Sequence, residues 1–106
     1  MLNAIDEVFQ FVEGHGFDQF DADKLRKYAV VQRMEVIGEA AKCIPQQMRA
    51  AYPQIPWRRL TGIRDRLAHG YFDIDYAVVW TMATDVFPIV RPELERVLRE
   101  LGHLND

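Results

Sequence analysis

The chain has 106 residues, a formal net charge of −3 at neutral pH and a single cysteine. This length predicts one domain, residues 1–106, which can bury a core without a disulfide or a structural metal. The lone cysteine excludes an intrachain disulfide and favours a reducing compartment. No apolar stretch approaches the roughly 20 residues needed to cross a bilayer, and the first residues are acidic rather than a basic leader. We therefore expect a cytoplasmic protein without a membrane anchor.

Apolar residues recur at helical spacing along almost the whole sequence, and no segment alternates with the period of a strand. The first predicted helix covers about residues 2–14. The second begins at Asp21, a good helix-capping residue, with Phe20 and Leu25 placed to form a hydrophobic staple. It runs to residue 43 or 44, because a proline follows and disfavours helical geometry in the residue before it.

The second predicted helix carries two apolar stripes, which indicates a central helix packed on more than one side. One stripe includes Met34 and Ile37, and the other includes Val36 and Cys43. Cys43 is therefore expected to be a small buried side chain. A polar strip lies between the stripes. Glu39 in this strip is either a solvated glutamate or the partner of an arginine that points inward.

A short helix is predicted between two prolines, over residues 45–52, and another from about Trp57 to His69. The last predicted helix starts near residue 73 or 75 and continues to about Leu101. Pro88 and Pro92 each remove a backbone hydrogen bond, so a bend or short break is expected there. The sequence thus predicts an all-α bundle of four major helices and a short fifth.

The predicted helix from Trp57 contains an unusual combination of side chains. On a helical wheel Arg64 falls inside the apolar stripe, where a guanidinium must be paired or functional. Asp65 and His69 lie one turn apart, so the carboxylate can orient the imidazole or stabilise its charged form. Gly70 suits a left-handed helix end just after the histidine. The stripe around Arg64 consists of Trp57, Leu60, Ile63 and Leu67.

The spacing of Arg64, Asp65, His69 and Tyr71 resembles the signature of the HEPN superfamily, and specifically that of its small HepT-like toxins. Further blocks similar to this family follow in the same order along nearly the whole chain. They are Met34–Ala41, Tyr52–Trp57, Gly70–Asp75 and Val79-Trp80. Several matching blocks in the right order are far more specific than the arginine-to-histidine spacing alone.

The resemblance implies an HEPN-like bundle that acts as a homodimer and cleaves RNA as a metal-independent endoribonuclease toxin. Arg64 would hold the phosphate, His69 would supply acid–base catalysis, and Asp65 would support the histidine. The partner would be a minimal nucleotidyltransferase antitoxin. In HepT-like toxins this partner attaches AMP units from ATP to the tyrosine that Tyr71 matches, and the toxin itself needs no cofactor.

The residue types fit this chemistry. A histidine poised near neutral pH can act as base or acid, and the planar fork of an arginine matches phosphate oxygens. Metal catalysis is not expected, because no histidine has a second histidine or a cysteine at ligand spacing. The chain has no serine, which excludes a serine triad, and Cys43 in an apolar setting is a poor nucleophile.

Positive charge is concentrated around the same region. Residues 1–23 hold six acidic residues and no lysine or arginine, whereas residues 49–66 hold five arginines and one acid. Arg58, Arg59 and Arg66 are candidate phosphate contacts, although a solvated helix face is an equally good reading of these residues. The overall acidic balance argues against a long nonspecific RNA channel.

A dimer would also resolve a geometric difficulty. Arg64 and His69 lie about 140° apart on a straight helix, too divergent for both to reach one phosphate easily. Either the helix unwinds at Gly70, or two such helices meet across a two-fold axis. Gly62 lies on the face of the histidine and would allow a close approach.

Other interpretations stay open. A catalytically inactive HEPN-type helical dimer could use the same residues to bind nucleotide or a partner, and the net negative charge slightly favours it. A purely structural bundle would have to pair Arg64 internally, for example with Glu39. Tyr71 would then only pack its ring after the helix end, and His69 would only cap the helix.

Overall fold

Every regular element in residues 1–63, 65 and 74–102, the part of the chain that the computed structural model describes, is a helix. This confirms the all-α prediction. None of these helices is long and apolar enough to cross a membrane. In chain order they are α1 (Leu2–Val12), α2 (Phe17–Ala22), α3 (Lys24–Lys42), α4 (Gln46–Ala51), α5 (Trp57–Thr61), α7 (Tyr76–Thr81), the π-helical η1 (Met82–Val86) and α8 (Phe87–Glu100).

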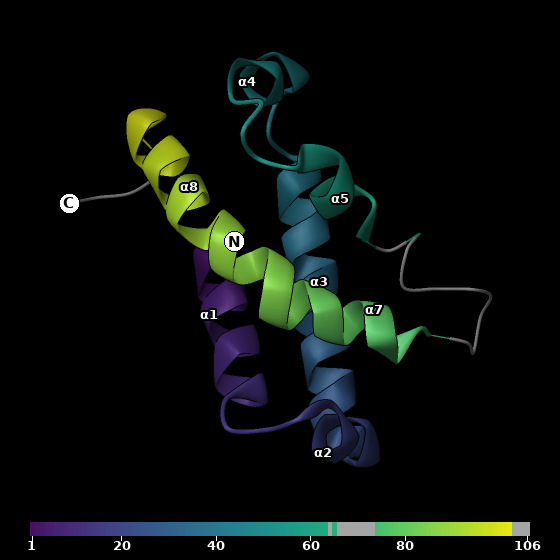
Figure 1. The fold of residues 1–106 in the computed structure, drawn as a ribbon. Helices are drawn as coiled ribbons and strands as arrows, with labels where there is room; N and C mark the ends of the chain where they lie inside the picture. Colours follow the sequence, from purple (N-terminus) through teal and green to yellow (C-terminus); the bar gives the residue numbers. More distant parts are fainter. Residues whose placement is uncertain (64, 66–73, 103–106) are drawn as a thin grey trace.

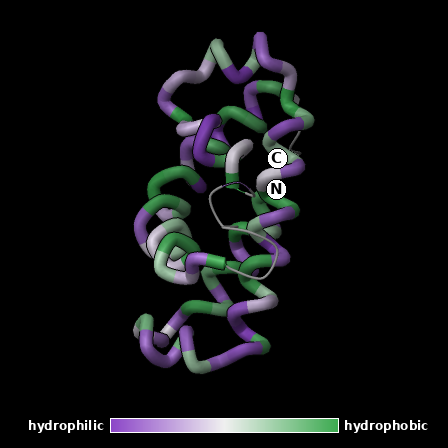
Figure 2. The backbone as a smooth tube through the Cα atoms, turned by 90° about the vertical axis from the view of Figure 1, so that its right-hand side faces the viewer, coloured by the Kyte–Doolittle hydropathy of each residue, from purple (hydrophilic) through white to green (hydrophobic). Residues whose placement is uncertain are grey.

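Three long helical bodies build the fold (Figure 1). α1 and α3 lie side by side in opposite directions, and the rod formed by α7, η1 and α8 crosses both. Figure 2 shows green and purple stretches alternating along the helices, as expected where each helix buries only one face. The largest fully buried side chains come from all of these bodies and from α2 and α5. They include Ile5, Phe20, Met34, Ile37, Leu60, Ile63, Phe87 and Leu94.

The start of the central helix differs from the prediction. Asp23, not Asp21, caps α3, because its carboxylate accepts a hydrogen bond from the backbone N–H of Arg26 at 3.0 Å. Phe20 belongs to the separate short helix α2 and is buried there, whereas Leu25 is 84% exposed. The expected staple between these two residues is therefore wrong. The chain is extended at Asp23, which separates α2 from α3.

Only one of the two predicted apolar stripes of α3 is buried within the chain. Met34 and Ile37 are fully buried, as expected, but Val36 and Cys43 are exposed. The prediction of a buried Cys43 is therefore wrong. The physical reason for Cys43 is that it lies at the C-terminal end of α3, where it borders an open hollow between α3, Met1 and Leu101.

The break predicted at the prolines takes the form of a wider helical turn. In η1 the N–H of Phe87 donates to the carbonyl of Met82, five residues earlier, and the helix continues as α8. A proline ring clashes with the carbonyl four residues before it, and the π turn lies directly before Pro88. The helix passes through Pro92 without a further break. The hydroxyl of Thr84 donates to the carbonyl of Trp80 at 2.8 Å within this turn.

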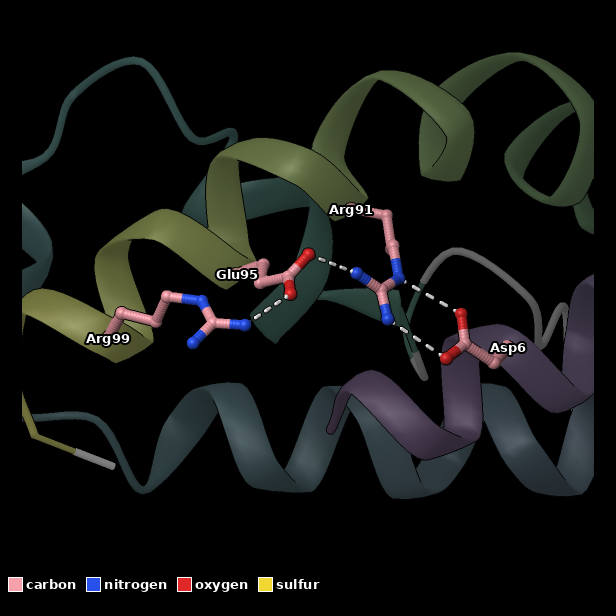
Figure 3. A network of polar contacts seen from close by, with 4 residues as sticks. All are labelled: Asp6, Arg91, Glu95 and Arg99. Carbon is pink, nitrogen blue, oxygen red and sulfur yellow. Dashed lines mark hydrogen bonds and ion pairs between the residues drawn. The ribbon is translucent and has the colours of Figure 1, made fainter. Parts of the chain in front are cut away.

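A polar network joins the first and last helices (Figure 3). Arg91 of α8 donates to both carboxylate oxygens of Asp6 in α1, at 2.9 and 3.0 Å, and its third nitrogen bonds to Glu95 at 2.5 Å. Glu95 also accepts a hydrogen bond from Arg99 at 3.0 Å. Hydrogen bonding from Arg91 lowers the pKa of Asp6, and partial burial opposes this effect.

Candidate active site

The segment that carries the candidate catalytic residues begins where α5 ends. The sequence predicts one helix from Trp57 to His69, but α5 stops at Thr61 and Gly62 departs from helical geometry, with φ −95° and ψ 11°. Ile63 and Asp65 are helical again. The predicted continuity of the helix is therefore wrong at Gly62.

Several predicted site residues lie outside the described part of the chain. These are Arg64, Arg66, His69 and Tyr71, together with the proposed helix end at Gly70. Their roles stay predictions. The structure does describe both flanks of this segment, the helix α5 before it and the helix α7 after it.

α5 is held firmly against the central helix. Trp57 is buried, and its indole N–H donates to the carbonyl of Tyr52 at 3.0 Å. Leu60 and Ile63 are fully buried. A Cβ atom added at Gly38 of α3 would lie 3.2 Å from the carbonyl oxygen of Leu60, so the backbones of the two helices pass very close. The chain thus enters the candidate site from a rigidly packed helix.

Gly62 has a local role in this arrangement. A Cβ atom there would lie 2.9 Å from the carbonyl oxygen of Arg58, which is closer than real Cβ contacts. The turn that ends α5 therefore requires a glycine at position 62. The predicted role of Gly62 in a close approach between two copies is not needed to explain its presence.

The far flank is anchored by a helix cap. The side chain of Asp75 accepts hydrogen bonds from the backbone N–H groups of Ala77 and Val78, at 3.1 and 3.3 Å. This cap fixes the first turn of α7, as expected for an aspartate at a helix N-terminus. Both ends of the segment between α5 and α7 are therefore tied to well-packed helices.

The described members of the predicted site are solvent-exposed. Arg58 and Arg59 on α5 are both exposed, and neither forms an ion pair with another described residue. Asp65 is exposed as well. Two unpaired arginines in front of the segment leave a positive surface that can hold phosphate.

Glu39 lies on the exposed side of α3. Its carboxylate is 3.5 Å from the ammonium group of Lys42, one turn further along the helix. Both side chains are largely solvent-exposed, so this pair adds little to stability. The predicted alternative, a contact between Glu39 and Arg64, involves a residue that the structure does not describe.

Arg59 borders a cleft that sequence patterns did not reveal. One hollow, of about 270 Å³, is lined by Arg59 and by residues of α7 and η1. A second, of about 380 Å³, extends from Arg59 toward α8. Arg59, Thr81 and Val86 line both, so the two hollows form one cleft. A helical wheel treats each helix alone, and this cleft arises only where α5 meets the rod.

Comparison with known proteins identifies the family. Residues 1–101 match the family model described as "Ribonuclease HepT-like". The chain belongs to the HepT-like ribonuclease family. Two proteins of Methanocaldococcus jannaschii, each bearing the name "Putative RNase", are 40% identical over 95% of this chain and over 87% and 84% of their own lengths. A Thermococcus cleftensis protein named "Probable ribonuclease HepT" is 35% identical, over 92% of this chain and 88% of its own. No solved structure matches.

In this HepT-like chain the matched region includes every predicted site residue, from Glu39 to Tyr71. Among the described residues, no three histidine, cysteine, aspartate or glutamate side chains come together as a metal site. The polar groups near the segment are those of the exposed arginines on α5, of Asp65 and of the cap at Asp75.

Proposed function

We propose that this chain is a metal-independent endoribonuclease and the toxin of a toxin–antitoxin pair. The observation that carries the proposal is the family match over residues 1–101, which contains the complete spacing of Arg64, Asp65, His69 and Tyr71. The relatives named as ribonucleases support an RNA substrate. The exposed, unpaired arginines of α5 support binding of a phosphate backbone.

In the proposed mechanism, Arg64 grips the scissile phosphate and stabilises the charge that builds on it. His69 takes the proton of the attacking 2′-hydroxyl or protonates the leaving oxygen, and Asp65 orients the imidazole. Arg58, Arg59 and Arg66 hold the neighbouring phosphates, and Glu39 helps to orient Arg64. Each chain supplies one such set of groups, and the active unit is a homodimer in which two such segments face one cleft.

The proposed regulation acts at Tyr71. A minimal nucleotidyltransferase antitoxin transfers AMP from ATP to the tyrosine hydroxyl, with release of pyrophosphate. The adduct is bulky and anionic and lies two residues from His69. It would block the cleft and compete with RNA for the arginines, which inactivates the toxin.

The decisive experiment compares cleavage of RNA by purified wild-type protein, Arg64→Ala and His69→Ala in the presence of a chelator. Each variant should lose about 10²- to 10⁴-fold in rate, as removal of a general acid–base or phosphate-binding group does. Thermal melting of each variant checks that the fold is intact. Cleavage that persists in the folded His69 variant would show that the base is another residue or that the activity is a contaminant.

The regulatory proposal is tested with Tyr71→Phe. This variant keeps the ring but loses the acceptor oxygen, so it should fold, cleave RNA and escape modification. Intact-mass spectrometry after incubation with the cognate transferase and ATP should show added AMP on the wild type alone. Equal modification of the phenylalanine variant, or a mass increase mapped to another residue, would contradict the assignment.

The acidic net charge favours one alternative function, a catalytically inactive helical dimer that binds nucleotide or a partner. In that case the wild-type protein would be folded and dimeric. It would nevertheless cleave RNA no faster than the double variant Arg64→Ala/His69→Ala does. The first experiment therefore separates the two functions.

A further inference from the structure

We propose that the cleft beside Arg59 is a subsite for a single nucleotide of the RNA. Arg59 would hold its phosphate, and its base would enter the hollow lined by Val78, Met82 and Val86. This inference rests on the proposed RNA substrate and adds a specific place for one nucleotide next to the reacting segment.

The shape and lining of the cleft suit a flat, largely apolar base that carries a charged group. The first hollow, of about 270 Å³, has apolar walls from α7 and η1, with Thr81 as a hydroxyl-bearing side chain and Arg59 at its border. Small-molecule sites have this composition, with mostly apolar walls and a few polar groups that fix orientation. One hollow therefore combines an apolar surface for the base with the guanidinium of Arg59 for the phosphate.

The charges indicate where the phosphate would lie. Arg59 is exposed and has no ion pair among the described residues, so its guanidinium is free to bind an oxygen anion. Asp85 and Glu93 line only the second hollow. Glu93 already pairs with Arg96 at 2.6 Å. Because carboxylates repel phosphate, the nucleotide is directed to the first hollow, away from the acidic end.

The position of this hollow links it to the proposed reaction. Arg59 lies in α5, which leads into the segment that begins at Arg64, and Ala77 and Val78 lie in the first turn of α7, which follows that segment. Both helices that flank the candidate catalytic residues thus line the hollow, α5 through Arg59 alone and α7 through Ala77, Val78 and Thr81. A nucleotide bound there would position a neighbouring phosphate of the same strand toward the segment.

The first test measures binding of a short single-stranded RNA with 2′-O-methyl groups, which cannot be cleaved by its own hydroxyl, using fluorescence anisotropy. Arg59→Ala should weaken binding about tenfold and reduce the slope of log affinity against log salt by about 0.7, as loss of one phosphate contact does. Lys24→Ala removes an equal charge from the exposed start of α3 and should change affinity less than about twofold. Equal losses in both variants would overturn the subsite.

A second variant, at Thr81, tests the lining of the hollow. Thr81→Glu adds a carboxylate to the hollow from an exposed position and should weaken binding in the wild-type background. Its effect should shrink in the Arg59→Ala background, because neighbouring groups of one site are coupled. Strictly additive effects of the two substitutions would contradict a shared nucleotide site.

The last test is independent of RNA. In protein with labelled methionine methyl groups, adenosine monophosphate should shift the NMR signal of Met82 but not that of Met34, which is fully buried in the core. Ribose 5-phosphate should bind more weakly, since it lacks the base. If the nucleotide shifts Met82 while RNA neither binds nor is cleaved, the hollow binds a nucleotide but is not an RNA subsite, and the proposed function is wrong. Equal binding of both ligands, or an unchanged Met82 signal, would overturn the subsite.

Discussion

At the scale of single residues, Arg91 stands out because it makes the most extensive ion-pair network in the described chain. It contacts Asp6 through two hydrogen bonds and Glu95 through a third (Figure 3). Most exposed ion pairs contribute little, but a two-point contact within a network restrains both side chains and connects two helices. The pair of Arg91 and Asp6 therefore fixes how α8 lies on α1.

Arg91→Met should lower the free energy of unfolding by about 1 kcal/mol near neutral pH, because the methionine keeps the aliphatic stem but loses the charge. The pKa of Asp6 is lowered in the folded state. Its stabilising effect is therefore present above the ordinary carboxyl pKa and is lost as pH falls through the lowered value. The difference between variant and wild type should consequently shrink in acid. Urea unfolding across pH measures this.

The matched control is Arg96→Met, which removes an arginine whose ion pair among the described residues, with Glu93, lies within α8. It should change stability by a few tenths of a kcal/mol at most. If the two variants were equally destabilised, or if the Arg91 difference stayed constant down to the acid limit, the contact with Asp6 would not be the cause.

At the scale of elements, Gly38 decides how closely α5 approaches α3. A β-branched side chain there would press on the Leu60 carbonyl and on Ile63, since even a Cβ atom lies within 3.2 and 3.5 Å of them. Gly38→Val should lower the free energy of unfolding by about 2 kcal/mol through overpacking. Because α5 leads into the candidate site, RNA cleavage should fall as well.

Gln32→Val is the control for this substitution. It places the same side chain in the same helix at an exposed position, where it changes helix propensity by less than about 1 kcal/mol and removes only exposed hydrogen bonds from Arg33. Thermal and urea unfolding of the two variants compare the effects. A Gly38 variant as stable as the Gln32 variant would show that the helices can separate without cost.

Some helices lie where the sequence predicts them, and others do not. The first helix and the short helix between the prolines lie close to their predicted positions, because local periodicity and proline stops define them. The cap of α3 was predicted wrongly at Asp21, because Asp23 is an equally good capping residue and local rules do not rank the two. The turn at Gly62 depends on the contact of α5 with α3, which no local pattern encodes.

The structure describes only some of the predicted site residues, and their chemistry stays a prediction. The arginines of α5 were recognised from charge spacing, and the structure places both at the surface. The cleft beside Arg59 was missed because its walls come from helices about twenty residues apart in sequence. Cys43 was expected to be buried because a wheel identifies an apolar stripe but not the element that covers it.

At the scale of the whole molecule, one chain leaves part of its central helix uncovered. Val36 of α3 is 39% exposed and lies on the same side as Cys43. α5, which leads into the candidate segment, packs on the C-terminal half of α3 at Gly38. A two-fold axis near the site would bring this exposed stripe against its copy.

We therefore expect a homodimer by light scattering at micromolar concentration, as symmetric dimers are the commonest assemblies. Val36→Lys should shift the protein toward monomer, because a charge would be buried at the interface. Leu25→Lys alters an exposed residue at the other end of α3 and should leave the mass unchanged. A strictly monomeric wild type would contradict the expected assembly.

The pairing of Asp6 with Arg91 has a consequence for synthesis on the ribosome. The two residues are 85 positions apart, and α8 also supplies Phe87 and Leu94 to the core. A nascent chain that ends before α8 lacks the helix that packs on α1, so the face of α1 that meets α8 stays exposed to water until this helix emerges. Folding is thus expected only on chain completion. Under the proposed toxin function, the chain would become active only after α8 has packed on α1.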